Sequence, residues 1–269
     1  MLRIYNSNWM SISQGIKVIL AVLFFSSAKA QEIQALVLED STQVAEKEQL
    51  KINYKQLIIP TVLIGYGIIG LESHQLLSFN TEIRTELKEH IDDKFTIDDF
   101  SQYTPIASIY ALDALGIKGK NNFKDKAIIS ATAYLIMGLT VNSLKKVSVV
   151  ARPDGTSFNS FPSGHTATAF MGAELLHQEY KDVSIWYSVS GYAIATGTGL
   201  FRMYNNRHWL SDVVTGAGIG IISAKMAYWV YPTVNKLFKK NNNKSNNSKT
   251  SFSPFYNGKT TGFCLVSTF

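Results

Sequence analysis

Six apolar blocks recur along this chain, and they constrain its fold more than any other feature. The first runs from Leu57 to Leu71 without a charged residue, and the others cover about 105–117, 127–143, 163–178, 183–201 and 210–231. Several blocks contain closely spaced small residues, as in the segment from Gly216 to Gly220. Small residues let helix backbones approach one another closely. We therefore expect an all-α fold in which six helices form a bundle.

The first thirty residues have the pattern of a secretory signal peptide. Two basic residues, Arg3 and Lys17, precede a short apolar run over 18–25, and small residues lead to Ala28-Lys29-Ala30. This order predicts a signal peptide over 1–30 that is removed before Gln31, and hence an exported protein of the cell envelope. The alternative is an uncleaved membrane anchor, although the apolar run is short for a full span.

The remaining chain divides into a lead-in over 31–55, a main domain over 56–232 and a tail over 233–269. Five of the six lysines of the tail stand among Asn and Ser residues over 236–249, a composition that predicts a basic, flexible segment. Asn257-Gly258 lies between residues of strand type, which predicts a hairpin near the C-terminus. This end of the chain is a structural cap, a disordered tail or a docking element. The single cysteine, Cys264, excludes an intramolecular disulfide.

The charge balance does not suggest a nucleic-acid partner. The formal net charge of the chain is +6, from 26 Lys and Arg against 20 Asp and Glu. Removing 1–30 removes three cations and no anions, so the balance falls to 26 − 3 − 20 = +3. Most of this excess lies in the tail, so we expect no basic surface of the kind that binds nucleic acid.

Three clusters of polar residues between 145 and 212 carry the chemistry. They are Lys145 with Arg152-Pro153, then Pro162-Ser163-Gly164-His165, and then Arg202 with His208 and Asp212. Hydrolysis of a phosphate ester needs positive charge on the phosphate oxygens, a nucleophile and an acid for the leaving oxygen. Lys145, Arg152 and Arg202 supply the charge, and the planar fork of arginine can hold two phosphate oxygens at once.

The other two clusters supply an anion site and a nucleophile. Ser163-Gly164-His165 stands just before a helical run, where backbone N–H groups point outward and bind anions. Gly164 lets the backbone approach a phosphate closely. His208 and Asp212 are four residues apart, so both side chains can meet on one face of a helix that starts near Trp209. The carboxylate then holds one imidazole nitrogen and leaves the other free to attack, with His165 remaining as the acid.

With these clusters in place, residues 55–232 resemble the type 2 phosphatidic acid phosphatases, which share their site with bacterial non-specific acid phosphatases and vanadium haloperoxidases. The family pattern is Lys, six residues, Arg-Pro; then Pro-Ser-Gly-His; then Ser-Arg, five residues, His, three residues, Asp. The resemblance implies that His208 is the nucleophile that becomes a phosphohistidine, that Asp212 orients it, and that His165 protonates the leaving oxygen. It also implies that the phosphate is bound by Lys145, Arg152, Ser163, Gly164 and Arg202. Phe201 departs from the pattern, since it occupies the place of the serine and removes one hydroxyl donor.

We expect no metal or other cofactor, because the three cations can do what a divalent ion would do. The expected activity is metal-independent hydrolysis of a phosphate monoester or pyrophosphate. If the bundle is membrane-embedded, the substrate is a lipid such as phosphatidic acid, phosphatidylglycerol phosphate, undecaprenyl pyrophosphate or lipid A. If it is soluble, a broad-specificity periplasmic acid phosphatase is expected instead. A vanadium haloperoxidase and a non-catalytic membrane protein are the further alternatives.

The number of membrane crossings decides on which side the site lies. With six crossings after signal cleavage, Lys145 would follow three of them and lie inside. A site facing the periplasm therefore requires that one early block does not span, and 105–117 is short and contains Asp113. Five crossings also leave the basic tail in the cytoplasm, as the positive-inside rule expects. The alternative is a bundle that does not span and is soluble or rests on the membrane surface.

Overall fold

The structure, a computed structural model, describes residues 54–88, 96–242, 249–256 and 261–268. It contains the following elements in chain order: a 3₁₀ turn η1 (Tyr54–Leu57), α2 (Ile58–Ile69), α3 (His74–Lys88), α4 (Ile97–Ser101), α5 (Thr104–Ala114), α6 (Phe123–Ser148), α7 (Gly164–Tyr180), α8 (Ile185–Tyr204), α9 (Leu210–Asn242), β1 (Lys249–Tyr256) and β2 (Thr261–Thr268). The predicted signal peptide, nearly all of the predicted lead-in and the predicted Asn257-Gly258 turn lie outside the described residues.

The predicted all-α bundle is confirmed. The six apolar blocks correspond to α2, α5, α6, α7, α8 and α9. Two further helices, α3 and α4, come from the polar stretch between the first two blocks. In the tail, β1 and β2 pair as an antiparallel hairpin with a register that runs from Lys249 opposite Thr268 to Tyr256 opposite Thr261.

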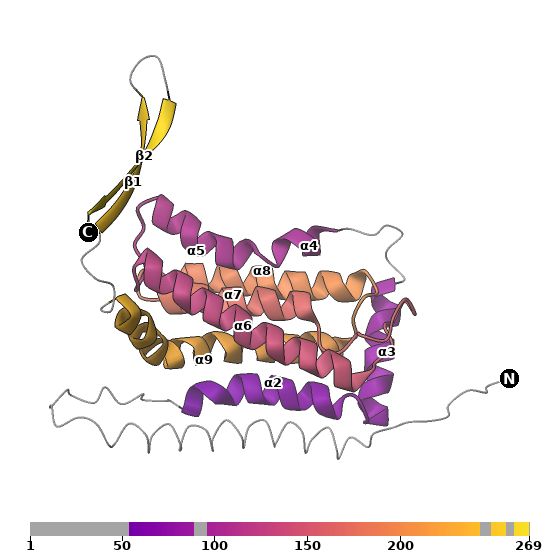
Figure 1. Ribbon diagram of the computed structural model, residues 1–269. Coiled ribbons are helices and arrows are strands. Elements are labelled where there is room, and N and C mark those ends of the chain that lie inside the picture. The colour runs from indigo at the N-terminus through magenta and orange to yellow at the C-terminus, as the bar shows by residue number, and fades with distance from the viewer. Residues whose placement is uncertain (1–53, 89–95, 243–248, 257–260, 269) are drawn as a thin grey trace.

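Helix α7 lies at the centre of the bundle, and α5, α6, α8 and α9 all pack against it (Figure 1). Most of its side chains are buried, and Met171, Leu175 and Tyr180 belong to the main hydrophobic core. Because α7 is enclosed on several sides, its N-terminal residues are held firmly at one end of the bundle. This is the end that carries Ser163, Gly164 and His165.

Two glycines on α9 let its backbone approach that of α7 closely. A Cβ atom on Gly216 would lie 2.5 Å from the backbone oxygen of Ser163, and one on Gly220 would lie 2.3 Å from that of Ala167. Real Cβ atoms do not approach backbone oxygens so closely, so both positions require glycine. This contact brings the first turns of α9, with Asp212, against the start of α7.

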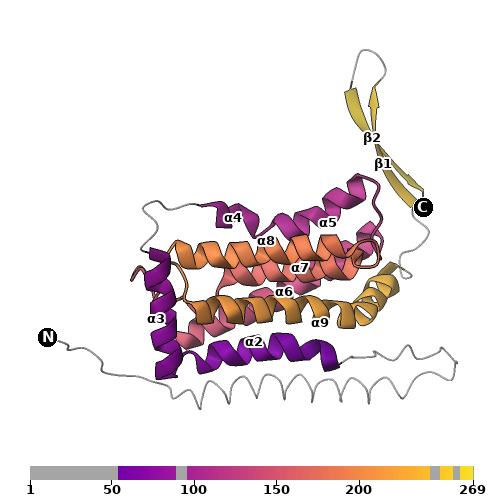
Figure 2. The ribbon, with the colours of Figure 1, turned by 180° about the vertical axis from the view of Figure 1, so that it is seen from behind.

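Helix α3 crosses one end of the bundle. The chain bends by 95° between the segments Tyr54–Ile69 and His74–Leu87, and Figure 2 shows α3 running across the ends of the long helices. Contacts from α3 to α8 and α9 fix it there. At this end α6 and α8 finish and α7 and α9 begin, so the three polar clusters of the sequence come together under α3. We refer to it below as the α3 end of the bundle.

Among the described residues, two helices are long and apolar enough to cross a membrane, judged by length and composition, and the bent pair Tyr54–Ile69 with His74–Leu87 adds a third if it forms one span. The two helices are α6, with a mean hydropathy of 1.6, and the part of α9 over Leu210–Lys236, with a mean hydropathy of 1.4. Helix α6 presents large apolar side chains outward, since Leu135 is 62% and Leu139 is 63% exposed. Helix α5 has 11 residues and so a length of about 16 Å, short of the ~30 Å hydrocarbon core of a bilayer.

Candidate active site

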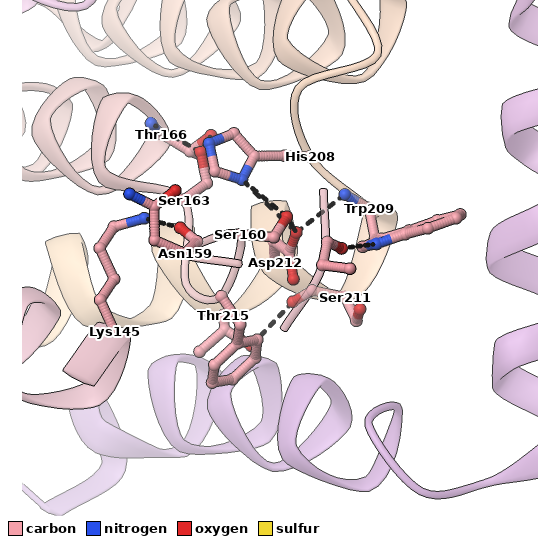
Figure 3. A network of polar contacts seen from close by, with 12 residues as sticks. Lys145, Asn159, Ser160, Ser163, Thr166, His208, Trp209, Ser211, Asp212 and Thr215 are labelled. Atoms are coloured by element: carbon pink, nitrogen blue, oxygen red, sulfur yellow. Dashed lines mark hydrogen bonds and ion pairs between the residues drawn. The ribbon is translucent and has the colours of Figure 1, made fainter. Parts of the chain in front are cut away.

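His208 and Asp212 form a buried pair at the start of α9. The Nδ1 atom of His208 lies 3.4 Å from Oδ2 of Asp212, and the two side chains are 2% and 0% exposed. Figure 3 shows one ring nitrogen of His208 directed at Asp212 and Ser160, while the other points away from them. The spacing of four residues therefore produces the predicted contact. The catalytic roles of the pair remain predictions.

Asp212 is fixed by hydrogen bonds from outside its own helix. Its Oδ2 atom accepts a hydrogen bond of 2.5 Å from the hydroxyl of Ser160 and one of 2.9 Å from the backbone N–H of Trp209. Its backbone oxygen accepts from the N–H of Ser163, which joins the start of α7 to α9. Its Oδ1 atom is buried without a partner in the described part of the chain. A carboxylate held in this way can orient an imidazole.

Burial makes His208 a neutral base. Desolvation lowers the pKa of His208 to about 4, and the positive charges of Arg202 and Lys145 act in the same direction, while Asp212 opposes them. Because the pKa lies far below neutrality, the imidazole is uncharged at neutral pH. An uncharged imidazole whose Nδ1 faces a carboxylate keeps its lone pair on Nε2, and this is the nitrogen that can attack.

Three of the predicted residues line one pocket of about 340 Å³ at the α3 end. They are Arg152, His165 and Arg202, and the other lining residues are Thr96, Asp98, Asp99, Asn205 and Arg207. The Nε atoms of Arg152 and Arg202 are buried and have no hydrogen-bond partner within the described ranges. Burial, Arg202 and Arg207 together lower the pKa of Arg152. Crowded, partly unpaired guanidinium groups of this kind suit an anionic ligand.

Ser163 and Gly164 form the N-terminus of α7. Ser163 is the N-cap residue, and its fully buried hydroxyl bonds to the backbone N–H and the hydroxyl of Thr166. A Cβ on Gly164 would meet nothing closer than Val141 Cγ1 at 3.8 Å. Packing within the protein therefore does not require glycine here. Close approach of a ligand to the backbone gives a reason for it.

Lys145 is placed differently from the other predicted phosphate ligands. It lies in the last turn of α6, and its Nζ atom donates a hydrogen bond of 2.6 Å to the backbone oxygen of Asn159. Figure 3 shows this contact beside the His208 and Asp212 pair. Lys145, like Ser163, Gly164 and His208, is not among the residues that line the pocket, and its contact with phosphate stays a prediction.

Several residues of the site were not identified from the sequence. Asp98 and Asp99, on the short helix α4, contact two of the predicted residues: Arg202 Nη1 donates to Asp98 Oδ2 at 2.5 Å, and His165 Nε2 lies 2.9 Å from Asp99 Oδ1. Ser160 was missed as well. Two adjacent acidic residues in a polar stretch give no sequence signal for such contacts. Phe201, at the position of the family serine, packs its ring against Tyr204, with centroids 5.9 Å apart.

Helix α3 holds the loops of the site together. Arg84 donates to Asn206 Oδ1 at 2.8 Å and to the backbone oxygen of Pro153 at 2.7 Å, and it lies over the ring of Trp209. Asn80, which is 3% exposed, exchanges hydrogen bonds with Ser211. These contacts connect the loop that carries Arg152 to the segment that carries His208. The alignment of the two clusters thus depends on α3.

The segment that carries this site is similar to known proteins. Residues 126–236 match the PAP2 superfamily model. A lipid A 1-phosphatase of Porphyromonas gingivalis is 46% identical over 135 residues, which are 50% of this chain and 30% of that protein. A lipid A 1-phosphatase of Rhizobium etli is 32% identical over 126 residues, which are 40% of this chain and 51% of that protein. This chain therefore spans at most about half the length of these two relatives.

Among solved structures, the crystal structure of Aquifex aeolicus LpxE is similar to this chain, with a TM-score of 0.44 and 26% sequence identity. The similarity covers 56% of this chain and 94% of that one. The family match over 126–236 includes Lys145, the start of α7 and the pair at the start of α9. These residues contain all three polar clusters, so the match to the PAP2 superfamily covers every predicted site residue.

Proposed function

We propose that this chain is a metal-independent phosphatase that hydrolyses the phosphate ester or pyrophosphate of a membrane lipid, with His208 as the nucleophile. One observation carries the proposal. A buried, neutral imidazole held by Asp212 lies near Arg202, and Arg152 lies near Arg202 and Asp212. The Nε atoms of both arginines have no partner in the described part of the chain. Arg202 is close enough to lower the pKa of both His208 and His165, so its charge acts on nucleophile and acid alike.

The reaction proceeds in two steps. In the first, Nε2 of His208 attacks phosphorus, the bond from phosphorus to the leaving oxygen breaks, and His165 gives its proton to that oxygen. In the second, water attacks the phosphohistidine, its proton passes to His165, and the electron pair of the phosphorus–nitrogen bond returns to His208. Arg152 and Arg202 balance the charge of the phosphoryl oxygens in both steps, which is the task that a metal ion would otherwise have.

Lys145, Ser163 and Gly164 complete the proposed phosphate site in different ways. The charge of Lys145 acts on His208 although its Nζ atom is bonded to Asn159, so it contributes positive potential whether or not it touches the ligand. Ser163 and Gly164 contribute the backbone N–H groups at the start of α7. These donors face an anion with the positive end of the helix dipole.

Two observations support a lipid substrate. The curated relatives described above are named lipid A 1-phosphatases, and the outward face of α6 carries exposed large apolar residues such as Leu135 and Leu139. An apolar face of this kind is stable against lipid rather than water. We propose phosphorylated lipids as the substrate class, with lipid A 1-phosphate, phosphatidylglycerol phosphate, phosphatidic acid and undecaprenyl pyrophosphate as the members to test.

The assay is phosphate release by purified full-length protein in detergent and in vesicles, on these four lipids and on an aryl phosphate, with His208→Ala as the control. We expect release from at least one lipid that exceeds release from the aryl phosphate and that the variant abolishes. If the protein hydrolyses the aryl phosphate in detergent-free buffer as fast as it hydrolyses the lipids, it is a soluble acid phosphatase. Bromide oxidation in the presence of added vanadate would instead indicate a haloperoxidase.

Trapping of the covalent intermediate tests the mechanism independently of the natural substrate. A short reaction with ³²P-labelled substrate followed by denaturation should leave label that is stable in base and released in acid, as expected for a phosphohistidine. The label should map to the peptide with His208 and should accumulate more in His165→Ala if water attack is slowed. Label on a serine would exclude His208 as the nucleophile. Turnover in which oxygen-18-labelled water attacks phosphorus directly would exclude it as well.

We also propose that the site faces the periplasm. The span over Leu210–Lys236 begins at the site and leads to the tail, so a spanning α9 places the site and the tail on opposite sides of the membrane. The tail carries six lysines, and basic segments stay on the cytoplasmic side. The orientation follows if α9 spans.

The single cysteine of the chain offers a direct test of this orientation. Cys264 is the only cysteine, and a membrane-impermeant maleimide should label it only after cells are permeabilised. In a Cys264→Ser background, Phe158→Cys adds a thiol at a position that is 68% exposed on the loop before α7. Because this thiol would face the periplasm, the maleimide should label it while the inner membrane is still intact. The reverse pattern would place the site in the cytoplasm.

A further inference from the structure

Helix α4 brings two adjacent carboxylates to the site, and Nη1 of Arg202 lies 2.5 Å from Oδ2 of Asp98 and 3.7 Å from Oδ1 of Asp99. Asp98 is 1% exposed and is committed to Arg202 Nη1 at 2.5 Å and to Asn205 Nδ2 at 3.0 Å. Asp99 has a side chain that is 53% exposed, and its Oδ1 atom lies 2.9 Å from Nε2 of His165. Asp98 therefore holds a phosphate ligand of the proposed site. Asp99 holds the proposed acid.

We propose that Asp99 is a positioning residue for His165, which it orients for proton donation to the leaving oxygen and whose imidazolium form it stabilises as a direct counterion. This inference rests on the proposed phosphatase activity and on the acid role of His165 within it. Neither residue 98 nor residue 99 falls in the three clusters of the family pattern or in the matched range of 126–236. The contact joins residues that are 66 positions apart in the chain.

The chemistry of a carboxylate fixes the tautomer of His165. An ionised carboxylate can only accept hydrogen bonds, so the contact with Asp99 places a hydrogen on Nε2 of His165. The Nδ1 atom is then the nitrogen that gives up a proton to the leaving oxygen. After that transfer, Nδ1 carries the lone pair that accepts a proton from water in the second step. One contact thus prepares His165 for both steps.

Asp99 also opposes the other charges around His165. Five charged side chains line the pocket with it: Arg152, Arg202, Arg207, Asp98 and Asp99. Burial and then the charge of Arg202 lower the pKa of His165, while Asp99 and Asp98 act to raise it. Of the two carboxylates, only Asp99 contacts the ring. Without it, the imidazolium form would lose its direct counterion and would exist only at lower pH.

The test compares Asp99→Asn and Asp99→Ala with wild type on an alkyl and on an aryl phosphate. Asparagine can still accept a hydrogen bond but lacks the charge, so the basic limb of the kcat/KM profile should move to lower pH. Alanine also loses the orientation, and its rate at neutral pH should fall about tenfold on the alkyl substrate and little on the aryl one, whose leaving group needs less protonation. Asp99→Glu should restore part of the alkyl rate.

Matched controls separate this role from a general effect of charge. Asp154→Asn removes a carboxylate that pairs with Arg207 at 3.1 Å and should leave the alkyl to aryl ratio unchanged. Adding Asp99→Asn to His165→Ala should cause no further loss of that ratio, because the two residues act as one unit. Since the Asp99 side chain is half exposed, the variants should fold, and their thermal unfolding should match wild type.

Different outcomes would overturn the role of Asp99 and the proposed phosphatase activity. If wild-type protein releases no phosphate from any substrate, the proposed phosphatase activity fails. If wild type is active and His165→Ala depends on the leaving group, but Asp99→Asn and Asp99→Ala change neither the ratio nor the basic limb, only the role of Asp99 is overturned. Equal losses on alkyl and aryl substrates in Asp99→Ala would also overturn it.

Discussion

Charged side chains are buried at both ends of the bundle, and the two sets differ in how their polar atoms are paired. At the end away from α3, Lys126 is 2% exposed and bonds to Asp113 at 2.7 Å and to the hydroxyl of Tyr180 at 3.2 Å. Glu179 is 3% exposed and accepts hydrogen bonds from Asn121 and Tyr228. These partners join the α5–α6 region to α7 and α9, as a structural network would.

The α3 end leaves polar atoms unpaired instead. Arg152 Nε, Arg202 Nε and Asp212 Oδ1 are buried with no partner among the described residues, and all three belong to predicted site residues. An unpaired buried polar group costs about 1–3 kcal/mol, so a structure keeps such groups where a ligand will use them. Burial of charge therefore does not identify a site, whereas incomplete pairing of buried polar atoms does.

The largest expected effect is at the α3 end. His208→Ala and the more nearly isosteric His208→Asn should lower phosphate release by about 10⁴-fold or more, because no other side chain replaces the nucleophile. Far-ultraviolet circular dichroism and thermal unfolding in detergent should show a folded protein in at least one variant. Turnover within tenfold of wild type in a folded variant would contradict the assignment of His208.

Both the helical bundle and the contact between His208 and Asp212 could be predicted from the sequence. The apolar blocks that became α6 and α9 are long and nearly free of charge, so helix is their only stable state in a core or a membrane. His208 and Asp212 meet because a helix brings residues four apart together. Both inferences depend on local geometry alone.

The rest of the site depends on contacts between distant parts of the chain. Asp98 and Arg202 are 104 residues apart, and Ser160 and Asp212 are 52 apart. A polar segment such as α4 has no apolar face from which its packing partner could be predicted, so its position is set only by tertiary packing. Lys145 shows the same limit, because its position in a motif did not reveal its hydrogen bond to the backbone of Asn159.

The next largest effect should appear in stability at the opposite end. Lys126→Met leaves the carboxylate of Asp113 without its buried partner and should lower the free energy of unfolding by about 3 kcal/mol. Unfolding in detergent with increasing denaturant measures this loss. The kcat of the protein that remains folded should equal that of wild type. The double variant Lys126→Met with Asp113→Leu should recover most of the stability, because it removes both charges.

Arg152→Ala tests the reverse combination at the α3 end. We expect a loss of about 10²-fold in kcat/KM and weaker inhibition by vanadate, whose trigonal-bipyramidal form resembles the transition state. Stability should be unchanged or higher, because the substitution removes an arginine whose positive charge is crowded by Arg202 and Arg207. Vanadate titration and thermal unfolding measure the two effects. A variant that loses stability and keeps its affinity for vanadate would show that Arg152 is structural, as Lys126 is.

The smallest effect concerns the pH dependence of His208. It compares the two ends of the bundle through a titration rather than through the loss of a side chain. Because burial lowers the pKa of His208 to about 4, the ring keeps its attacking lone pair down to that pH. The acid limb of kcat/KM should therefore fall about tenfold per pH unit only below pH 4, whereas an exposed histidine nucleophile would give a limb near 6.5. The sign follows from protonation, since a lower pH adds the proton that blocks Nε2.

Two variants test the origin of this limb. Lys126→Met, at the other end of the bundle, should leave the limb in place. Asp212→Asn should move it to still lower pH, because Asp212 favours the charged ring. An acid limb near pH 6.5 in folded wild-type protein would mean that water reaches His208 and that the site is less enclosed than its burial indicates.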